Sequence, residues 1–561
     1  MRILLVSTSF NSLTQRTLVE LTDRGYDVVF KPTPSAELWM ETVATVKPDV
    51  ILAPFLKTAI PEEIWRLHKC IIVHPGIKGD RGPSSLDRAI MDEKKQWGVT
   101  LLQADKEMDE GDIWATRRFP MKPVSKSCLY RHEVAQAAVE CILEVIKKLQ
   151  DRNFKPEALD YSKPDVEGCL HLPIKQAERQ INWNEPTKTI VKKIMAADSN
   201  PGVLDVWFGE QYYLYGVHEE DVLNGIPGAI LAQRDGAVCR ATGDGAVWIS
   251  HMKQKGGGVK LPSTIILKDK LDTVPEIPLS PFEEYNGRTF REIRFEEVDG
   301  VGYLYFDFYN GAMSTEQCIR LRETLVDIKK RDIRVIVLMG GSDFWSNGIH
   351  LNVIEHSLNA ADESWINIVA MDDLVREIIL TEKQLVISAI RGNAGAGGAI
   401  LALAADRIFA RNGVVLNPHY KKMGGLYGSE YWTYLLPKRV GAKEALKLTN
   451  ECQPIGTTRS KLIGLIDDSF GENNEQFEEN VKIIATDLAN SSNYEQLLLD
   501  KRVARMMDEA MKPLETYCKE ELEQMWKNFY GEDKSYHIAR YNFVHKISCT
   551  VSPLTPALLM N

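Results

Sequence analysis

The segment Gly392–Asp406, GNAGAGGAILALAAD, is the most informative part of this sequence. Four glycines fall within its first seven residues, after the apolar segment Leu385–Ile390 and before an alanine-rich helix. Glycine lets a backbone approach a ligand closely, and free N–H groups at a helix start suit a negative charge developing on a carbonyl oxygen. Such turns also serve plain packing or phosphate binding, so the segment alone leaves these readings open.

A second segment of the same kind lies earlier in the chain. Residues 338–351, LMGGSDFWSNGIHL, read as a strand that leads through a glycine loop into a helix. The two segments together resemble the paired oxyanion-hole loops of the crotonase (enoyl-CoA hydratase/isomerase) family. The resemblance implies a ββα spiral with C-terminal helices, a coenzyme A (CoA) thioester as substrate, and an oxyanion hole formed by the backbone N–H groups of Ile349 and Gly397.

The composition limits the class of protein. With 561 residues, 44% of them hydrophobic and 26% charged, the chain predicts a globular protein of several domains. Its net charge of −10 argues against a nucleic-acid partner, and the absence of a long apolar run argues against a membrane span. Nine cysteines without a C-x-x-C pair fit reduced thiols in the cytoplasm and predict no metal site.

The N-terminal part alternates strand-like and helix-like segments. Arg2–Ser7 and Val50–Pro54 read as buried strands, and Leu13–Arg24 has helical spacing. This alternation predicts an α/β fold with a doubly wound parallel sheet, which binds ligands at the carboxyl ends of its strands. Gln15 follows the first strand, and Arg131 lies at the start of a later helix. Both are candidate ligand contacts, with capping or a solvated surface as the alternative.

Two motifs of this part carry a candidate active site. Cys70–Ile90 contains His74-Pro75 and then Arg81-Gly82, and Val99–Ile113 ends in Asp109-Glu110-Gly111-Asp112. They resemble the motifs of the formyltetrahydrofolate-dependent formyltransferases. The resemblance implies 10-formyltetrahydrofolate as donor, His74 as the proton acceptor, Asp109 as its partner, and Arg81 in the cofactor site.

One position departs from the formyltransferase pattern. The catalytic Asn of that family stands two residues before the His, where this chain has Ile72. Losing an oxyanion donor can cost about 3 kcal/mol of transition-state stabilisation. Either another donor replaces the Asn or the acceptor differs. A thiol acceptor would need less help, because a thiolate is already a strong nucleophile.

The middle of the chain changes character. Short β-like runs alternate with Gly/Asp turns and resemble the OB-like C-terminal domain of the tRNA formyltransferases, although no basic stripe for tRNA is present. We therefore expect a formyltransferase domain over 1–165, a small OB-like β-barrel over 166–275, and a crotonase-like domain over 285–561.

The crotonase-like half lacks the two glutamates of the hydratases, since Ile400 and His419 occupy the corresponding places. Glu430 follows in an aromatic, glycine-rich stretch that would raise a carboxyl pKa by desolvation. We expect Glu430 as acid/base and Tyr420 as its hydrogen-bonding partner, with His419 and His350 in reserve. In the alternative, Glu430 serves only the dipole of a helix N-terminus.

Basic residues of the C-terminal helices are candidates for binding the phosphates of CoA. They are Lys501, Arg502 and Arg540, and the alternative for each is a solvated surface charge.

The combination of the two halves resembles the HypX (HoxX) family of [NiFe]-hydrogenase maturation proteins. It implies formyl transfer from 10-formyltetrahydrofolate to CoA, then decarbonylation of formyl-CoA to carbon monoxide and CoA. It also implies small-molecule substrates, with hydrogenase maturation proteins or the hydrogenase large subunit as protein partners. Two alternatives stay open: a formyl-CoA or acyl-CoA hydrolase, and a non-catalytic formyl-carrier scaffold.

Overall fold

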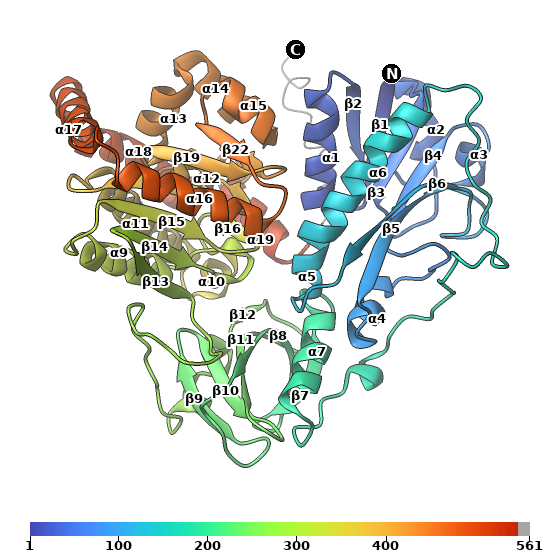
Figure 1. The fold of residues 1–561 in the computed structure, drawn as a ribbon, viewed down its shortest axis with the longest axis horizontal. Coiled ribbons are helices and arrows are strands. Elements are labelled where there is room, and N and C mark those ends of the chain that lie inside the picture. Colours follow the sequence, from blue (N-terminus) through green and yellow to red (C-terminus); the bar gives the residue numbers. More distant parts are fainter. Residues whose placement is uncertain (548–561) are drawn as a thin grey trace. The chain divides into compact units, whose positions relative to one another are not determined.

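The computed structural model describes residues 1–547. The chain forms two compact units, each with its own core (Figure 1). The first comprises Met1–Ile277 and Gly287–Phe290, and the second comprises Pro278–Asn286 and the chain from Arg291 onward. The predicted limits 1–165 and 166–275 both fall within the first unit. No helix in the described part of the chain has the length and apolar character needed to cross a membrane.

The first unit begins with a six-stranded sheet in the order β2-β1-β3-β4-β5-β6. Its strands are β1 (Arg2–Ser7), β2 (Asp27–Pro32), β3 (Val50–Phe55), β4 (Cys70–His74), β5 (Gln96–Gln103) and β6 (Ile113–Pro120). The first four strands pair in parallel, as the strand–helix alternation predicts. The predicted doubly wound parallel sheet also has an antiparallel edge, where β5 runs antiparallel to both β4 and β6. The link between β5 and β6 holds no helix, so it cannot make the crossover that a parallel pair requires.

Helices cover both faces of this sheet. Apolar side chains of α1 (Ser12–Asp23) and α6 (Ala135–Lys148) share one core with the sheet, and those of α2 (Leu38–Val46) and α3 (Glu62–Trp65) share another. Along β4 the side chains alternate between the two cores, so the strand is buried on both faces and ends at His74.

The rest of the first unit is an antiparallel sheet in the order β7-β8-β11-β10-β9, with β12 beside β11. Its strands are β7 (Val203–Trp207), β8 (Glu210–Glu220), β9 (Ile230–Arg234), β10 (Ala237–Ala241), β11 (Ala246–Gln254) and β12 (Leu261–Pro262). These green strands curl toward a barrel in Figure 1, with α7 (Thr187–Ala197) packed against them. The predicted small β-domain is therefore present.

The second unit contains two sheets. The larger has the order β13-β14-β15-β17-β19-β22 and is parallel from β14 onward; the smaller has the order β16-β18-β20-β21. Their strands are β13 (Ile293–Val298), β14 (Val301–Phe306), β15 (Val335–Gly340), β16 (Phe344–Ser346), β17 (Leu385–Ile390), β18 (Asn393–Gly395), β19 (Arg407–Arg411), β20 (Val415–Asn417), β21 (Ile455–Gly456) and β22 (Asp468–Phe470). A long strand and then a short one recur along the chain, as in a ββα spiral.

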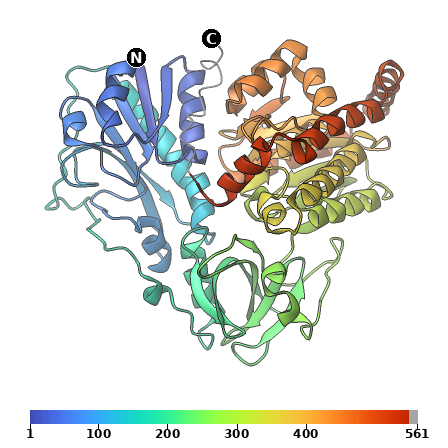
Figure 2. The same cartoon turned by 180° about the vertical axis from the view of Figure 1, so that it is seen from behind.

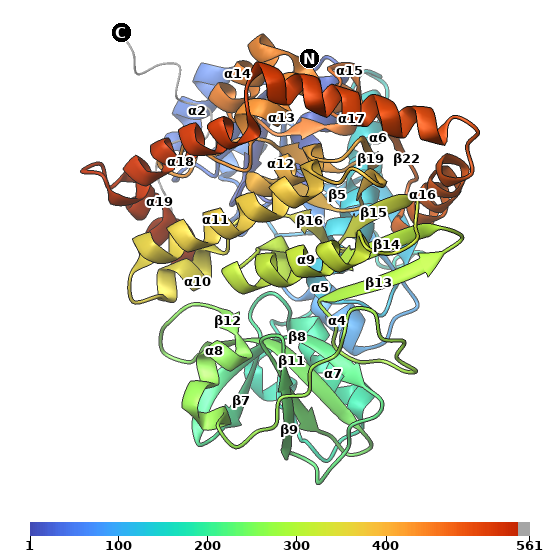
Figure 3. The ribbon, with the colours of Figure 1, turned by 90° about the vertical axis from the view of Figure 1, so that its left-hand side faces the viewer.

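Helices enclose the larger sheet. On one face α9 (Thr315–Ile328) and α11 (Ala360–Ile379) lie side by side (Figure 3), and they share a core with α12 (Gly397–Leu403), α13 (Trp432–Val440) and α18 (Leu514–Tyr530). On the other face lie α16 (Asn474–Ala489) and α17 (Tyr494–Met511). Figure 2 shows the C-terminal helices in red, ending with α19 (Ser535–Val544). In the two glycine loops Gly348, Gly397 and Gly398 are buried, whereas Asn347 is exposed.

Candidate active sites

His74 lies at the carboxyl end of β4 between two carboxylates. Its Nε2 is 2.8 Å from Oδ2 of Asp80, and its Nδ1 is 3.5 Å from Oδ1 of Asp109. His74 and Asp80 are almost fully buried, whereas the Asp109 side chain is 15% exposed. A methyl group on Gly76 would come within 2.4 Å of both His74 Nε2 and Asp80 Oδ2. Only glycine at position 76 therefore leaves room for the Asp80 contact.

Arg81 fixes the loop that carries Asp109. Its Nε donates to the carbonyl oxygen of Met108 at 3.1 Å, and its Nη1 pairs with Oε1 of Glu110 at 3.0 Å. Asp109 has a φ of 59°, a left-handed conformation that a non-glycine residue keeps only when its surroundings hold it. Arg81, predicted as a cofactor contact, thus has a positioning role within the protein.

The two carboxylates determine the charge of His74. Burial by itself lowers the pKa of His74, but the hydrogen bonds to Asp109 and Asp80 outweigh burial and raise the pKa to about 9. Burial likewise raises the pKa of Asp109, and His74 more than compensates, so the net pKa of Asp109 is lowered. At neutral pH the site therefore holds an imidazolium between negative charges.

Ile72 stands two residues before His74, so the two side chains lie on the same face of β4. Ile72 is in the middle of β4, paired with Ala53 and Leu102, and its side chain packs against an apolar core. Gln15 lies on α1, where its amide donates to the Phe10 carbonyl oxygen at 2.9 Å.

Arg131 belongs to a helical segment that packs beside α1. It lies in the π-helical turn Tyr130–Val134, between α5 (Lys126–Leu129) and α6. Asn11 Nδ2, at the N-terminus of α1, lies 3.4 Å from the Tyr130 hydroxyl. Gln15 and Arg131 therefore lie on neighbouring helical segments.

The predicted oxyanion loops lie side by side in the second unit. β16 and β18 pair in parallel, and a methyl group on Gly348 would be 3.3 Å from the nitrogen of Gly397. Gly397 is the first residue of α12, where an N–H has no partner within the helix. Within residues 1–547 the structure records no acceptor for the N–H of Ile349 or of Gly397. Both donors thus remain available for a carbonyl oxygen.

Glu430 and Tyr420 lie against this loop pair. The Tyr420 hydroxyl is 2.6 Å from Glu430 Oε2, and a methyl group on Gly397 would lie only 2.1 Å from Glu430 Oε1. Glu430 and Tyr431 both have a φ of 60°, so a left-handed turn directs the carboxyl toward Gly397. No side-chain cap is formed at the start of α13, and the Glu430 carboxyl contacts Tyr420 instead, which argues against the helix-dipole alternative.

Burial controls the protonation of this pair. It raises the pKa of Glu430 above the usual range of a glutamate, and the nearby charge of Asp372 raises it further. The pKa of Tyr420 is raised well above its ordinary value by burial and by Glu430. A carboxyl group with a raised pKa beside an oxyanion hole can both give and take a proton near neutral pH.

The two reserve histidines are buried away from this hydrogen-bond pair. Nδ1 of His350 accepts from the Val353 N–H at 3.2 Å at the start of α10 (Leu351–His356), and burial lowers the His350 pKa to about 4. Burial lowers the pKa of His419 to about 3, and neither of its ring nitrogens has a hydrogen-bond partner among the described residues. Both are neutral imidazoles at pH 7.

The three candidate phosphate ligands differ in availability. Lys501 Nζ is 2.6 Å from Asp406 and 2.8 Å from the Gln384 carbonyl oxygen. Arg540 is 94% buried and pairs with Glu355 at 2.9 Å. These internal pairs leave Lys501 and Arg540 poorly placed for a ligand, and only Arg502 is exposed.

The structure adds residues that the motifs do not identify. Asp80 lies inside the first motif, where an acid before the Arg-Gly pair is the only sequence signal. Asp372 lies on α11 and accepts hydrogen bonds from the Ser429 hydroxyl and the Glu430 N–H. It belongs to no motif, so nothing in the sequence distinguishes it from a surface carboxylate.

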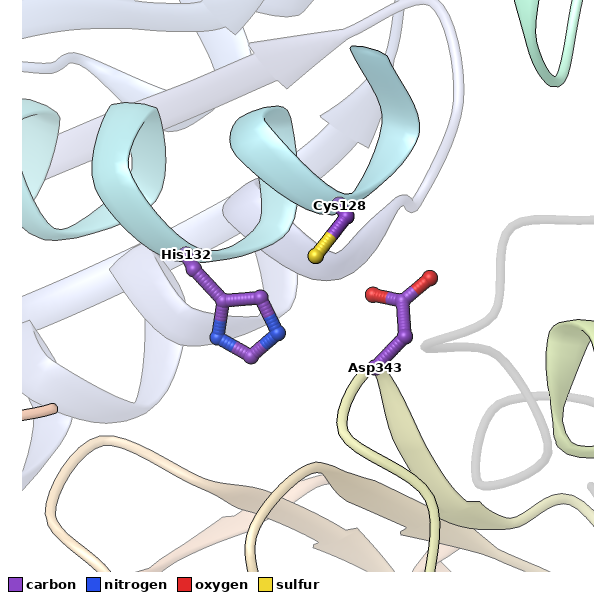
Figure 4. Close-up of side chains that lie close together, drawn as sticks. All are labelled: Cys128, His132 and Asp343. Carbon is purple, nitrogen blue, oxygen red and sulfur yellow. The ribbon is translucent and has the colours of Figure 1, made fainter. Parts of the chain in front are cut away.

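Cys128 and His132 lie four positions apart on one helical segment of the first unit, and Figure 4 shows them together with Asp343. Asp343 belongs to the second unit. We therefore assign no metal site to these three side chains.

Three known families match successive segments of this chain. The formyl transferase family matches residues 31–146, its C-terminal domain family matches 173–264, and the enoyl-CoA hydratase/isomerase family matches 307–548. The hydrogenase maturation factor HoxX of Bradyrhizobium diazoefficiens is 45% identical over 559 residues, which cover 99% of this chain and 97% of that protein. The chain belongs to the HypX (HoxX) family.

A comparison with solved structures shows that this chain also has the fold of HypX. A crystal structure of HypX from Aquifex aeolicus in complex with tetrahydrofolic acid has a TM-score of 0.96 at 45% identity, covering 99% of this chain and 98% of that one. The methionyl-tRNA formyltransferase of Thermotoga neapolitana is 27% identical over 222 residues, 39% of this chain and 69% of that protein. The resemblance to a hydrogenase maturation factor with formyltransferase and crotonase-like domains is thereby confirmed.

Proposed function

We propose that this HypX-family chain makes carbon monoxide for the active site of a [NiFe]-hydrogenase in two steps. The observation that carries the proposal is the arrangement around Glu430. The buried carboxyl group of Glu430 lies directly against the oxyanion hole formed by the N–H groups of Ile349 and Gly397. The pair of glutamates that activates water in the hydratases is absent from this site. Such a site suits a thioester that must lose a proton and its sulfur without the addition of water.

In the first step, the formyl group moves from 10-formyltetrahydrofolate to the thiol of CoA. The sulfur attacks the formyl carbon, the carbon–nitrogen bond breaks, and the folate nitrogen takes up a proton. The imidazolium of His74 would give the proton that the folate nitrogen takes up, and the ring would then recover the proton that the thiol loses, with Asp109 relaying the protons. The positive charge held on His74 favours a negative tetrahedral intermediate, which helps to offset the missing Asn at Ile72. The tetrahydrofolic acid bound to HypX of Aquifex aeolicus supports folate as the carrier.

In the second step, formyl-CoA breaks down to carbon monoxide and CoA. The N–H groups of Ile349 and Gly397 would hold the thioester oxygen. The formyl proton goes to a base, the carbon–sulfur bond breaks with its electrons on sulfur, and the thiolate takes up a proton. Glu430, assisted by Tyr420, would be the group that exchanges both protons. Arg502 could bind a CoA phosphate, and Gln15 and Arg131 other polar groups of CoA.

A carbon monoxide assay with haemoglobin as the trap tests both steps. The purified chain receives 10-formyltetrahydrofolate and CoA, beside His74→Ala and Glu430→Gln. We expect carbon monoxide from the wild type only, with formyl-CoA accumulating in Glu430→Gln. Formate with tetrahydrofolate, and no carbon monoxide, would identify a formyl hydrolase. No turnover would favour a scaffold that delivers a formyl carrier to hydrogenase maturation proteins or the large subunit.

A further inference from the structure

Asp372 is a buried carboxylate that the proposed chemistry does not yet use. It projects from α11 with 3% of its surface exposed. Its oxygens accept from the Ser429 hydroxyl at 2.8 and 2.7 Å and from the Glu430 N–H at 2.7 Å, and the Cys518 thiol lies 3.8 Å away. These groups are all donors toward Asp372. Burial raises the pKa of Asp372, and these donors act in the opposite direction because they stabilise the charged form of a carboxyl group. Asp372 has more donors than Glu430, so Asp372 is the member of the pair favoured as the anion.

Glu430 has a poorer set of donors, with the Ser429 N–H 3.3 Å from its Oε2. The Tyr420 hydroxyl lies 2.6 Å from Glu430 Oε2 and 3.1 Å from the Ser429 carbonyl oxygen. One hydroxyl proton cannot serve two acceptors at once. If Glu430 carries a proton, it donates to the Tyr420 oxygen, and Tyr420 donates to the buried carbonyl oxygen of Ser429. Protonated Glu430 thus satisfies the hydrogen bonds that ionised Glu430 would leave incomplete.

We infer that Asp372 is a positioning residue of the second site: as the anion of a buried pair, it holds the Ser429–Glu430 turn and keeps the shared proton on Glu430, beside Gly397. The inference rests on the proposed decarbonylation. Glu430 would then give its proton to the departing sulfur and take the formyl proton in return. The carbon–hydrogen electrons become the lone pair on the carbon of carbon monoxide, so Glu430 ends each turnover as it began.

Asp372 also holds the backbone geometry. Glu430 and Tyr431 are consecutive left-handed residues, a conformation that costs free energy unless the surroundings compensate. The hydrogen bond from the Glu430 N–H to Asp372 lies within this turn, in a region where an unpaired N–H would be costly. The Asp372 side chain therefore both provides the negative charge beside Glu430 and stabilises the left-handed turn.

Other titratable groups around the pair do not favour a second anion. Burial raises the pKa of Glu521 well above its ordinary value, and it raises the pKa of the Cys518 thiol to about 12. Asp373, on α11 beside Asp372, adds a weak repulsion. The titratable groups that interact with Glu430 or Asp372 include Tyr420, Cys318, Asp373, Tyr431, Cys518 and Glu521. The cation Arg376 lies one turn from Asp372 on α11 and acts on Tyr431. Because neither carboxylate forms an ion pair with a cation among the described residues, two carboxylate charges together would be poorly balanced, and one proton stays in the pair.

Infrared difference spectroscopy on the full-length chain locates that proton without any change at Asp372. The spectrum of Glu430→Gln is subtracted from that of the wild type at pH 7, with ¹³C-labelled glutamate or ¹³C-labelled aspartate. We expect a protonated-carboxyl band that shifts with labelled glutamate alone. A band that shifts with labelled aspartate, or no protonated band, would overturn the inference.

A pH profile tests the coupling in turnover, with formyl-CoA supplied so that the first site is bypassed. The rate of carbon monoxide release should fall at high pH as Glu430 loses its proton. In Asp372→Asn this fall should move to lower pH by about one unit, because removal of the nearby negative charge lowers the pKa of Glu430. Asp373→Asn, which removes an exposed carboxylate of the same helix, should leave the profile in place. A fall at the same pH in Asp372→Asn as in the wild type would refute the inference. Absence of carbon monoxide from the wild type would instead refute the decarbonylation, and the infrared result would still decide where the proton lies.

Discussion

At the scale of single residues, two carboxylates stabilise the protonated form of the buried His74 ring. Two carboxylates contact its two nitrogens, and Gly76 gives the space for one of them. The His74 pKa of about 9 lies above the ordinary value of 6.5. Protonated His74 therefore stabilises the fold fully below pH 6.5, and this contribution is lost as the pH rises through 9.

This linkage predicts the effect of removing Asp80. Between pH 6 and 10 the wild type should lose on the order of 3 kcal/mol of unfolding free energy from His74, because each pKa unit corresponds to about 1.4 kcal/mol. In Asp80→Asn the loss should be smaller and should be complete at a lower pH, because the folded-state pKa of His74 is lower. Denaturant unfolding at several pH values measures it.

The exposed Asp112, in the same loop as Asp109, provides the matched control. Asp112→Asn should follow the wild-type curve. If Asp80→Asn also followed that curve, Asp80 would not hold the charge of His74, and the 2.8 Å contact would have no energetic weight.

At the scale of elements, helix α18 supports the loop that carries Glu430. The Tyr427 N–H donates to Asn528 Oδ1 at 3.0 Å, and the Thr433 N–H donates to Glu521 Oε1 at 2.7 Å. Both bonds cross from the loop to the helix, one on each side of the left-handed turn. Helix α18 therefore helps to set the direction of the Glu430 carboxyl.

Asn528→Ala should loosen this support without touching the first site. An unpaired N–H at Tyr427 is expected to cost about 1 kcal/mol of stability. Carbon monoxide release from formyl-CoA should fall several-fold, while formyl transfer to CoA stays at the wild-type rate. The exposed neighbour Lys527 gives the control variant Lys527→Ala. Equal losses in both half-reactions would indicate a general structural defect.

At the scale of the whole molecule, the proposed reacting groups of each candidate site belong to one unit. His74, Asp80 and Asp109 belong to the first unit, and Gly397 and Glu430 belong to the second. We therefore predict that the half-reactions are separable. His74→Ala should release carbon monoxide from supplied formyl-CoA, and Glu430→Gln should make formyl-CoA.

A mixture of the two variants tests this separation directly. Given 10-formyltetrahydrofolate and CoA, the mixture should produce carbon monoxide at a rate that rises with the concentration of His74→Ala. Each variant alone should produce almost none. If His74→Ala failed to convert supplied formyl-CoA although it was folded, the sites would depend on each other and the prediction would be wrong.

The sequence by itself determined the α/β class, the family, and the candidate groups His74, Asp109, Tyr420 and Glu430. These predictions follow from short motifs in which glycine, histidine and acidic residues occur at fixed spacing. Such local patterns can be recognised in the sequence without the structure. The parallel part of the first sheet was predictable for the same reason. Its antiparallel edge was not, because the direction of β5 depends on which strand it meets.

Only the tertiary structure decided the environment of those groups. Asp372 meets Glu430 across 58 positions, and a buried helix face gives no motif that marks the contact. Asp80 is near His74 in sequence, yet its role depends on a loop that folds back through Gly76. Lys501 and Arg540 read as surface cations, but carboxylates distant in the chain bind them. Burial and charge pairing arise from long-range packing, and these determine which groups are ionised and which remain free to bind a substrate.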